Sequence, residues 1–228
     1  MHDKPNAPAV ASPLEPGEYV TEKGWGRLKL IRQGDNLLFS LNSMTGEAGC
    51  TLSGHVSDGS GIAKQDSIPL VCVVSFSRRS QGVEISAKTT TECSHFCGYN
   101  GGFEGIYFRT TSGCSQTGIE QTRKTFKQLY SSKDYKSALA KLAPILTNCL
   151  TTLEWEEEGG IRNDIAMAQY KNGLYHECLQ TLGQYAEDAA RDDDSIVDDW
   201  TPALAERYLS IVKTARTNIA LCTDNEEK

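Results

Sequence analysis

The chain has 228 residues, of which 39% are hydrophobic and 23% are charged. These proportions are typical of a soluble globular protein and exclude a disordered chain. No stretch approaches the roughly 18 consecutive apolar residues that a membrane-spanning helix needs. The length suits one large domain or two small ones.

The net charge of −7 is shared unevenly between the two halves. Residues 115–228 hold 13 basic and 19 acidic residues, so nearly all of the excess negative charge lies there. Nucleic-acid binders need a basic stripe, and this distribution therefore argues against a nucleic-acid partner. It favours a basic protein as the partner.

Eight cysteines are spread through both halves of the chain. An even, high count favours disulfides in an oxidising compartment, because the cytosol keeps thiols reduced. The alternative is a zinc site, but Cys93 and Cys97 are the only close pair and a tetrahedral site needs a second one. We expect disulfides, with no metal and no cofactor.

The first residues carry no signal peptide, since a basic start and an apolar stretch are both missing. Residues 1–16 are instead rich in Pro and Ala. We interpret them as a flexible leader behind a removed signal, which could have been a lipoprotein signal, with Met1 as an expression start. The predicted location is the bacterial periplasm.

Residues 17–113 are predicted to form a β-rich, disulfide-stapled domain. Apolar and polar residues alternate over 37–41 and 83–87, and the apolar, β-branched stretch 70–76 suits a central strand. A final strand is expected over 105–109. Short polar turns separate these stretches, so we expect an antiparallel meander or a small barrel-like sandwich.

Residues 114–228 change to a helical period, with about five helices punctuated by Gly159-Gly160 and by Gly173. Two stretches, YSSKDYKSALAKL from Tyr130 and YKNGLYHECLQTL from Tyr170, align without a gap at an offset of 40 residues. The pattern resembles the tetratricopeptide repeat, with residues 154–160 as an insertion. The alternative is an ordinary antiparallel helix pair. The predicted fold class is α+β.

No catalytic constellation is evident around the four histidines, His2, His55, His95 and His176. His55 lies in a Ser- and Gly-rich stretch, but the glycine-serine-glycine elbow of hydrolases is missing and no third catalytic member is apparent. We therefore expect a binding protein and not an enzyme.

Two regions are candidates for partner binding. The first is a possible protruding loop made of Ser57, Asp58, Gly59, Ser60 and Gly61, for which a simple β-turn is the alternative. The second is the acidic run of Glu156, Glu157 and Glu158, with a further run over residues 192–199; solvated loops are the alternative there.

Sequence order cannot settle the disulfide pairing, because eight cysteines allow 105 connectivities. Nearest partners within each structural unit give Cys50 with Cys72, Cys93 with Cys97, Cys114 with Cys149, and Cys178 with Cys222. Cys178 would then occupy the small-residue position of the second hairpin.

Three stretches together resemble a family. CSHFCGYNGGFEGIYF, the bridge GCSQTGIEQTRKTFKQLYSSKDYKSALAKLAPILTNC, and IRNDIAMAQYKNGLYHECLQTL with ARTNIALC look like periplasmic proteins grouped with LprI-type lysozyme inhibitors. The likeness covers most of the chain beyond residue 17. It implies a periplasmic role against peptidoglycan-cleaving enzymes, and it transfers no inhibitory residue.

The sequence thus predicts an inhibitor or immunity protein that occludes a basic cell-wall hydrolase. One alternative is an envelope scaffold that receives a partner peptide on its helical repeats. A hydrolase centred on His55 is the third.

Overall fold

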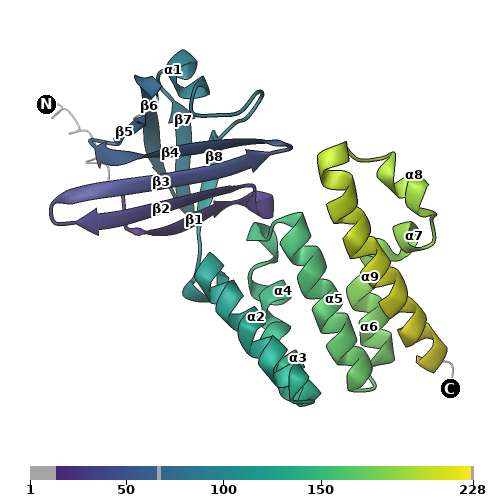
Figure 1. Cartoon of the computed structure of the whole chain (residues 1–228). Helices are drawn as coiled ribbons and strands as arrows, with labels where there is room; N and C mark the ends of the chain where they lie inside the picture. The colour runs from purple at the N-terminus through teal and green to yellow at the C-terminus, as the bar shows by residue number, and fades with distance from the viewer. Residues whose placement is uncertain (1–13, 66–67, 227–228) are drawn as a thin grey trace, which may run out of the picture. The chain divides into compact units, whose positions relative to one another are not determined.

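The computed structural model describes residues 14–65 and 68–226, so residues 1–13 of the predicted leader lie outside the described part (Figure 1). The chain divides into two compact units. Among the described residues, one contains 14–21 and Gly26–Arg109, and the other contains Glu22–Trp25 and residues 110–226. The first is built of strands and the second of helices, which confirms the α+β class. The division follows Arg109, whereas the sequence predicted it after residue 113.

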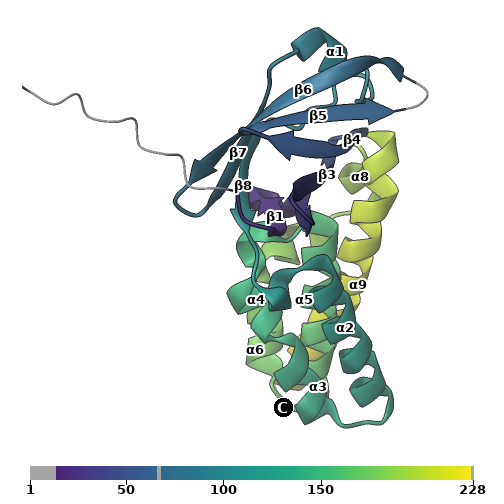
Figure 2. The same cartoon turned by 90° about the vertical axis from the view of Figure 1, so that its left-hand side faces the viewer.

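The β unit is a closed barrel of eight antiparallel strands, each paired with its neighbours in the chain, and β8 closes the barrel against β1. This is the predicted meander in its barrel form. The strands are β1 (Gly17–Thr21), β2 (Gly26–Gln33), β3 (Asn36–Thr45), β4 (Ala48–Ser57), β5 (Ser60–Gln65), β6 (Ile68–Arg79), β7 (Gly82–Ala87) and β8 (Gly105–Arg109). A short helix, α1 (Thr90–Ser94), follows β7 in the chain and lies beside β6 (Figure 2).

Alternation along the strands directs one face into the barrel. On β3 the predicted Leu37, Phe39 and Leu41 are buried, and on β7 Val83 and Ile85 are buried. The largest fully buried side chains of the barrel are Tyr107, Leu28, Leu30, Leu41, Leu52 and Ile85. Eight-stranded barrels either fill their interior with side chains or hold one small ligand. Here these side chains form one hydrophobic core cluster.

The barrel disulfides join Cys50 to Cys97 and Cys72 to Cys93, so the predicted pairs Cys50–Cys72 and Cys93–Cys97 are wrong. Strand β5 separates β4, which carries Cys50, from β6, which carries Cys72. Two strand spacings amount to about 9.6 Å, beyond the ~7 Å that a disulfide spans between Cα atoms. Instead α1 packs beside β6, and Cys97 forms an isolated bridge to the start of β4.

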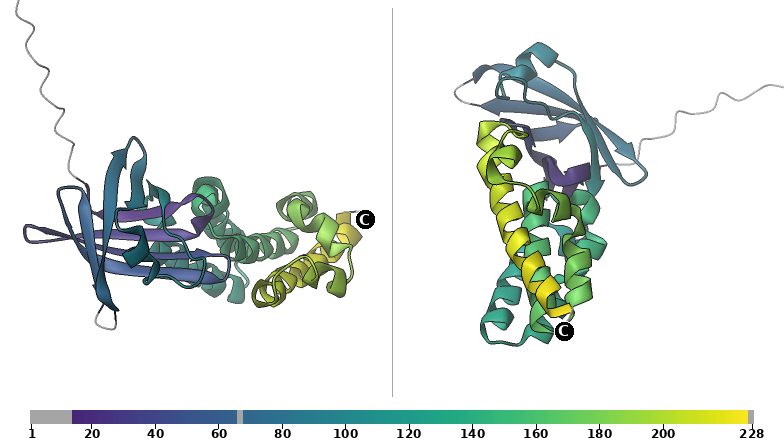
Figure 3. Two further views of the ribbon diagram at one scale, coloured as in Figure 1. Left: turned by 90° about the horizontal axis from the view of Figure 1, so that it is seen from above. Right: turned by 90° about the vertical axis from the view of Figure 1, so that its right-hand side faces the viewer.

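The helical unit consists of α2 (Gln116–Ser131), α3 (Tyr135–Leu142), α4 (Pro144–Asn148), α5 (Trp155–Lys171), α6 (Tyr175–Leu182), α7 (Ala186–Ala189), α8 (Asp193–Val197) and α9 (Pro202–Glu226). The 3-10 turns are η1 (Glu22–Gly24), η2 (Ser112–Cys114), η3 (Leu150–Thr152) and η4 (Gly183–Tyr185). Helix α2 pairs with α3 and α5 with α6, while α9 packs against both α5 and α6 (Figure 3).

The hairpins α2–α3 and α5–α6 repeat each other at the predicted offset of 40 residues. The backbone N–H of Asp134 donates to the carbonyl of Leu129, and that of Leu174 donates to the carbonyl of Gln169 in the second copy. Both turns bring two tyrosine rings together: Tyr130 with Tyr135 at 5.0 Å and Tyr170 with Tyr175 at 5.8 Å between centroids. The equivalent small residues Ala138 and Cys178 are both fully buried.

Residues 154–160 are not an insertion, and Gly159-Gly160 does not break a helix: both glycines lie within α5. A Cβ at Gly159 would lie 2.7 Å from Cδ1 of Ile211 on α9. The glycine therefore allows α5 and α9 to approach closely, although glycine within a helix costs about 1 kcal/mol relative to alanine. The residues between the two hairpins instead form α4 and η3.

The helical disulfides follow the prediction: Cys114 bonds to Cys149, and Cys178 bonds to Cys222. The first ties the segment before α2 to the end of α4, and the second ties α6 to α9. Buried polar contacts reinforce the packing of α9. The Asn218 amide donates to the backbone carbonyl and the side-chain oxygen of Asn163 on α5.

Candidate partner-binding surfaces

The predicted loop from Ser57 to Gly61 is a two-residue hairpin turn. Strand β4 ends at Ser57 and β5 begins at Ser60, while Asp58 and Gly59 have φ values of 49° and 70°. Two consecutive positive φ angles fit the type I′ turn, which matches the twist of the flanking strands. The Asp-Gly pair thus explains the tight connection, and little of the chain extends beyond the strands.

Hydrogen bonds hold this turn. The Gly59 carbonyl accepts a hydrogen bond from the Phe76 backbone N–H at 2.8 Å, and the Ser60 hydroxyl accepts one from Lys88 Nζ at 2.7 Å. Gly61 is buried, and Ser57 is exposed. The Cys50–Cys72 bridge that was expected to restrain this stretch is not formed. The turn is rigid because of its strand pairing and these hydrogen bonds.

The three glutamates of the acidic run occupy the first turn of α5, where carboxylates interact favourably with the helix dipole. Glu158 is buried, and its carboxylate accepts a hydrogen bond from Arg162 Nε at 2.7 Å. Glu156 is paired with Arg207 of α9. Glu158 therefore supports the helical unit and cannot face a partner.

Two aspartates of the second acidic run are held by contacts within their own unit. Asp193 pairs with Lys213 and Arg216, whose hydrogen bonds lower the pKa of its carboxyl. Asp192 caps α8 by accepting hydrogen bonds from Ser195, which lower its pKa too. Residues 192–199 thus form a structured corner with internal ion pairs.

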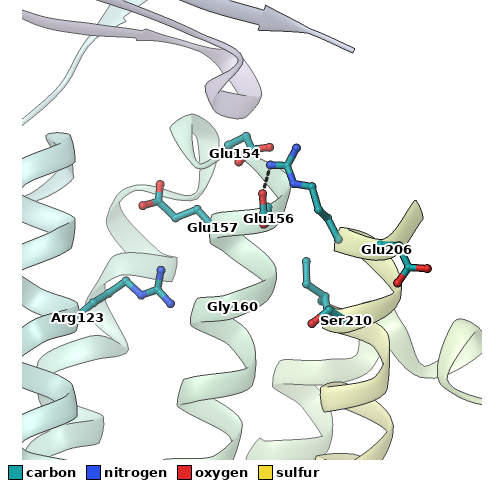
Figure 4. Close-up of a pocket in the computed structure, with 9 residues that line it drawn as sticks. Arg123, Glu154, Glu156, Glu157, Gly160, Glu206 and Ser210 are labelled. Atoms are coloured by element: carbon teal, nitrogen blue, oxygen red, sulfur yellow. Dashed lines mark hydrogen bonds and ion pairs between the residues drawn. The ribbon is translucent and has the colours of Figure 1, made fainter. Parts of the chain in front are cut away.

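A cavity of about 620 Å³ opens between α2, α5 and α9 of the helical unit (Figure 4). Four carboxylates and two guanidinium groups line it together with a hydroxyl and small or apolar residues. We call it the acidic groove; its residues are Arg123, Glu154, Glu156, Glu157, Gly160, Glu206, Arg207, Ser210 and Ile211. The excess of carboxylates makes it suitable for a cationic segment.

Contacts with neighbouring residues hold Arg123 in the wall of the acidic groove. Gly160 leaves space beside Arg123, because a Cβ there would lie 3.3 Å from the guanidinium. Arg123 in turn pairs with Asp164 at 3.5 Å. Burial raises the pKa of Asp164, and the charge of Arg123 opposes that rise.

Sequence reasoning identified Glu156 and Glu157 of this groove but missed Arg123, Glu206, Arg207 and Ser210. Those residues lie on α2 and α9, far from α5 in the chain. The repeat in the sequence was the feature that could have identified this groove. In stacked hairpins the first helices lie side by side. Polar residues on α2, α5 and α9 would then share one surface.

The described histidines lie on separate elements. His55 lies on the exposed face of β4, His95 follows α1, and His176 on α6 contacts Glu226 and Gln180. His2 lies outside the described residues. Within residues 14–65 and 68–226, no group of three or more His, Cys, Asp or Glu side chains is placed to hold a metal ion.

No protein-family model, no curated protein and no solved structure matches this chain. Across the described part of the chain, none of the helices combines the length and the apolar character needed to cross a bilayer. Four disulfides with no free cysteine indicate a protein of an oxidising compartment.

Proposed function

We propose that this chain is a periplasmic protein that binds and occludes a peptidoglycan-degrading enzyme, as a lysozyme inhibitor or as an immunity protein. The family resemblance of its sequence motivates the choice of target. The observation that carries the binding role is the apolar core of the barrel. Because buried side chains such as Leu41, Leu52 and Tyr107 pack together inside it, we assign the function to its turns and outer surface.

Rigidity supports the same proposal. Each unit is braced by two disulfides, so its surface loses little conformational freedom when a partner binds. A preformed surface is what an inhibitor needs, because each segment that must be ordered on binding reduces the affinity.

Charge supports a basic target. The excess of acidic residues lies in residues 115–228, and opposite charges accelerate the encounter of two proteins. That acceleration falls as salt screens the charges. We therefore expect faster association with a basic hydrolase at low salt than at high salt.

The test combines capture with activity. The disulfide-intact protein is passed over resin carrying a basic lysozyme, and peptidoglycan clearing by that lysozyme is measured with and without the protein. Retention together with suppressed clearing supports the proposal. A chain that clears peptidoglycan alone would be an enzyme, and a chain that neither binds nor inhibits lysozymes or bacterial cell-wall hydrolases is not an inhibitor. Reduced and alkylated protein is the control for the fold.

The acidic groove favours a second function, an envelope scaffold. In tetratricopeptide-like arrays the first helices of successive hairpins line a surface that receives extended peptides. Helices α2, α5 and α9 line the groove here, with four carboxylates against two guanidinium groups. We propose that, in this role, the occupant is a Lys- or Arg-rich peptide.

A charge reversal within the groove separates the two functions. Glu206→Lys should weaken binding of a lysine-rich peptide, measured by fluorescence anisotropy at low salt, while Glu177→Lys outside the groove should not. Unchanged binding by Glu206→Lys would contradict the scaffold role. Lysozyme inhibition that survives Glu206→Lys would assign inhibition to another surface.

A further inference from the structure

Tyr99 is the most exposed large hydrophobic side chain of the described residues, with 92% of its surface open to solvent. It lies in the segment between α1 and β8, at the corner of a turn that the Gly101 N–H closes by donating to the Gly98 carbonyl at 2.9 Å. Asn100, the next residue, has a φ of 60°. Asparagine tolerates this left-handed conformation better than most residues.

The turn is held from both sides by buried aromatic rings. Phe96 before it and Phe103 after it belong to the barrel core, with 6% and 4% of their surfaces exposed. The Phe96 carbonyl accepts a hydrogen bond from the Thr51 N–H at 3.0 Å. Phe96 and Phe103 thus anchor the segment, and Tyr99 projects outward.

Covalent and polar contacts add to this anchoring. Cys97, two residues before Tyr99, bonds to Cys50 at the start of β4, and the Gly98 N–H donates to the Gly49 carbonyl at 2.8 Å. After the turn, the Gly102 N–H donates to the Thr45 hydroxyl, and its carbonyl accepts from the Ser43 hydroxyl. The backbone that presents Tyr99 is thus fixed before any partner arrives.

A second exposed apolar side chain adjoins this segment. Met44, 56% exposed, pairs in register with Gly49, the residue that binds Gly98. Neither side chain belongs to the core cluster of the barrel. An exposed tyrosine on a rigid backbone is typical of a binding anchor, because aromatic side chains that enter a pocket supply most of the energy at many interfaces.

We propose that Tyr99, supported by Met44, is the side chain that enters the glycan-binding cleft of the inhibited hydrolase. This inference rests on the proposed inhibitory function and names its binding site. Tyrosine combines a flat apolar ring with a terminal hydroxyl, so it can replace a sugar ring by packing its face on the cleft and hydrogen-bonding through its hydroxyl. Because the backbone around Tyr99 is already fixed, binding costs little conformational entropy.

The Tyr99 turn and the Ser57–Gly61 turn lie at opposite ends of β4. Gly49, which holds the Tyr99 segment, lies near the start of β4, and Ser57 is its last residue. At the rise of a strand these two positions are roughly 26 Å apart. We therefore treat the two turns as separate surfaces.

The experiment measures inhibition of a basic lysozyme by the disulfide-intact chain and its variants. Tyr99→Ala should raise the inhibition constant at least about 30-fold, the loss typical of an interface hot spot, mainly through faster dissociation. Tyr99→Phe should retain most of the inhibition, and Gln33→Ala, an exposed control at the far end of β2, should change it less than about 3-fold. An oligosaccharide of N-acetylglucosamine should compete with the wild-type protein for the enzyme.

Thermal unfolding of each variant checks that the barrel is intact, which we expect because Tyr99 is exposed. If the wild type inhibits and Tyr99→Ala inhibits equally well, the inference about Tyr99 is overturned and the inhibitory function stands. If the wild type does not inhibit, the proposed function fails, and the inference fails with it.

Discussion

Lys133 and Gly173, forty residues apart, occupy the same left-handed position in the two helical hairpins, with φ values of 65° and 74°. Each backbone N–H donates to the carbonyl of a tyrosine three residues earlier, Tyr130 or Tyr170, at 3.0 Å. Glycine adopts this conformation without strain, whereas a residue with a Cβ does not.

This relationship predicts opposite effects of two substitutions. Lys133→Gly should stabilise the helical unit by about 0.5 kcal/mol, because relief of the strained φ exceeds the added freedom of the unfolded chain. Gly173→Ala should destabilise it by about 1 kcal/mol; the cost is conformational, since no atom lies within 4 Å of the added Cβ. Urea unfolding of both variants measures the difference. If both substitutions changed the free energy of unfolding by the same amount and with the same sign, the two turns would not be equivalent.

The Cys178–Cys222 disulfide predicts a local effect. It joins residues 44 apart in sequence and fixes α9 to α6. Replacing both cysteines by alanine removes a cross-link worth about 3–4 kcal/mol on the chain-entropy estimate. Hydrogen exchange over residues 205–222 should become faster, while exchange in the barrel strands stays the same. Unchanged exchange in that segment would show that the packing of α9 does not depend on the bridge.

The buried Glu158–Arg162 pair predicts that the acidic run does not act as one surface. Only 10% of the Glu158 side chain and 17% of the Arg162 side chain are exposed. Glu158→Gln should lower the free energy of unfolding of the helical unit by about 3 kcal/mol, because it leaves a buried guanidinium without its charge partner. Glu177→Gln on α6 is the matched control for an exposed carboxylate. Equal stability of the two variants, measured by urea unfolding, would contradict this role.

The raised pKa of Asp164 predicts a pH dependence of defined sign. Burial makes the folded protein hold this proton more tightly than the unfolded chain, whose carboxyl titrates near 3.8. The resulting stability is complete below that value and is lost as pH rises through the folded pKa. Asp164→Asn should therefore gain in stability relative to the wild type as pH increases from acidic to neutral. A constant difference between the two proteins across that range would exclude the effect.

The sequence predicted the helical disulfides better than the barrel disulfides for a physical reason. Cys114 with Cys149 ties the segment before α2 to the end of α4, and Cys178 with Cys222 joins the packed helices α6 and α9, so nearness in the chain was a fair guide. In the barrel, the partner of Cys50 depends on which strands are adjacent. That adjacency is set by pairing around the whole barrel, which local alternation of apolar residues does not reveal.

The sequence also predicted one candidate binding site better than the other. An Asp-Gly pair between two strands was enough to anticipate a β-turn at Asp58-Gly59 as an alternative to a protruding loop. The exposure of Tyr99 was not evident, because its neighbours Phe96 and Phe103 are also aromatic and are buried. The glycines at 98, 101 and 102 were the signal that the chain turns there and leaves the tyrosine outside.

Gly61 makes the last prediction, which separates packing from partner binding within the Ser57–Gly61 stretch. A Cβ at this buried position would lie 2.5 Å from the Phe76 ring and 2.8 Å from the Phe39 ring. These two rings meet edge to face, with centroids 5.2 Å apart, and the missing side chain makes room for them. Gly61→Ala should therefore destabilise the barrel by about 1–3 kcal/mol through overpacking. Gly102→Ala is the control, since no atom lies within 4 Å of its added Cβ. Calorimetric unfolding compares them, and a Gly61→Ala variant as stable as the control would show that the rings can move aside.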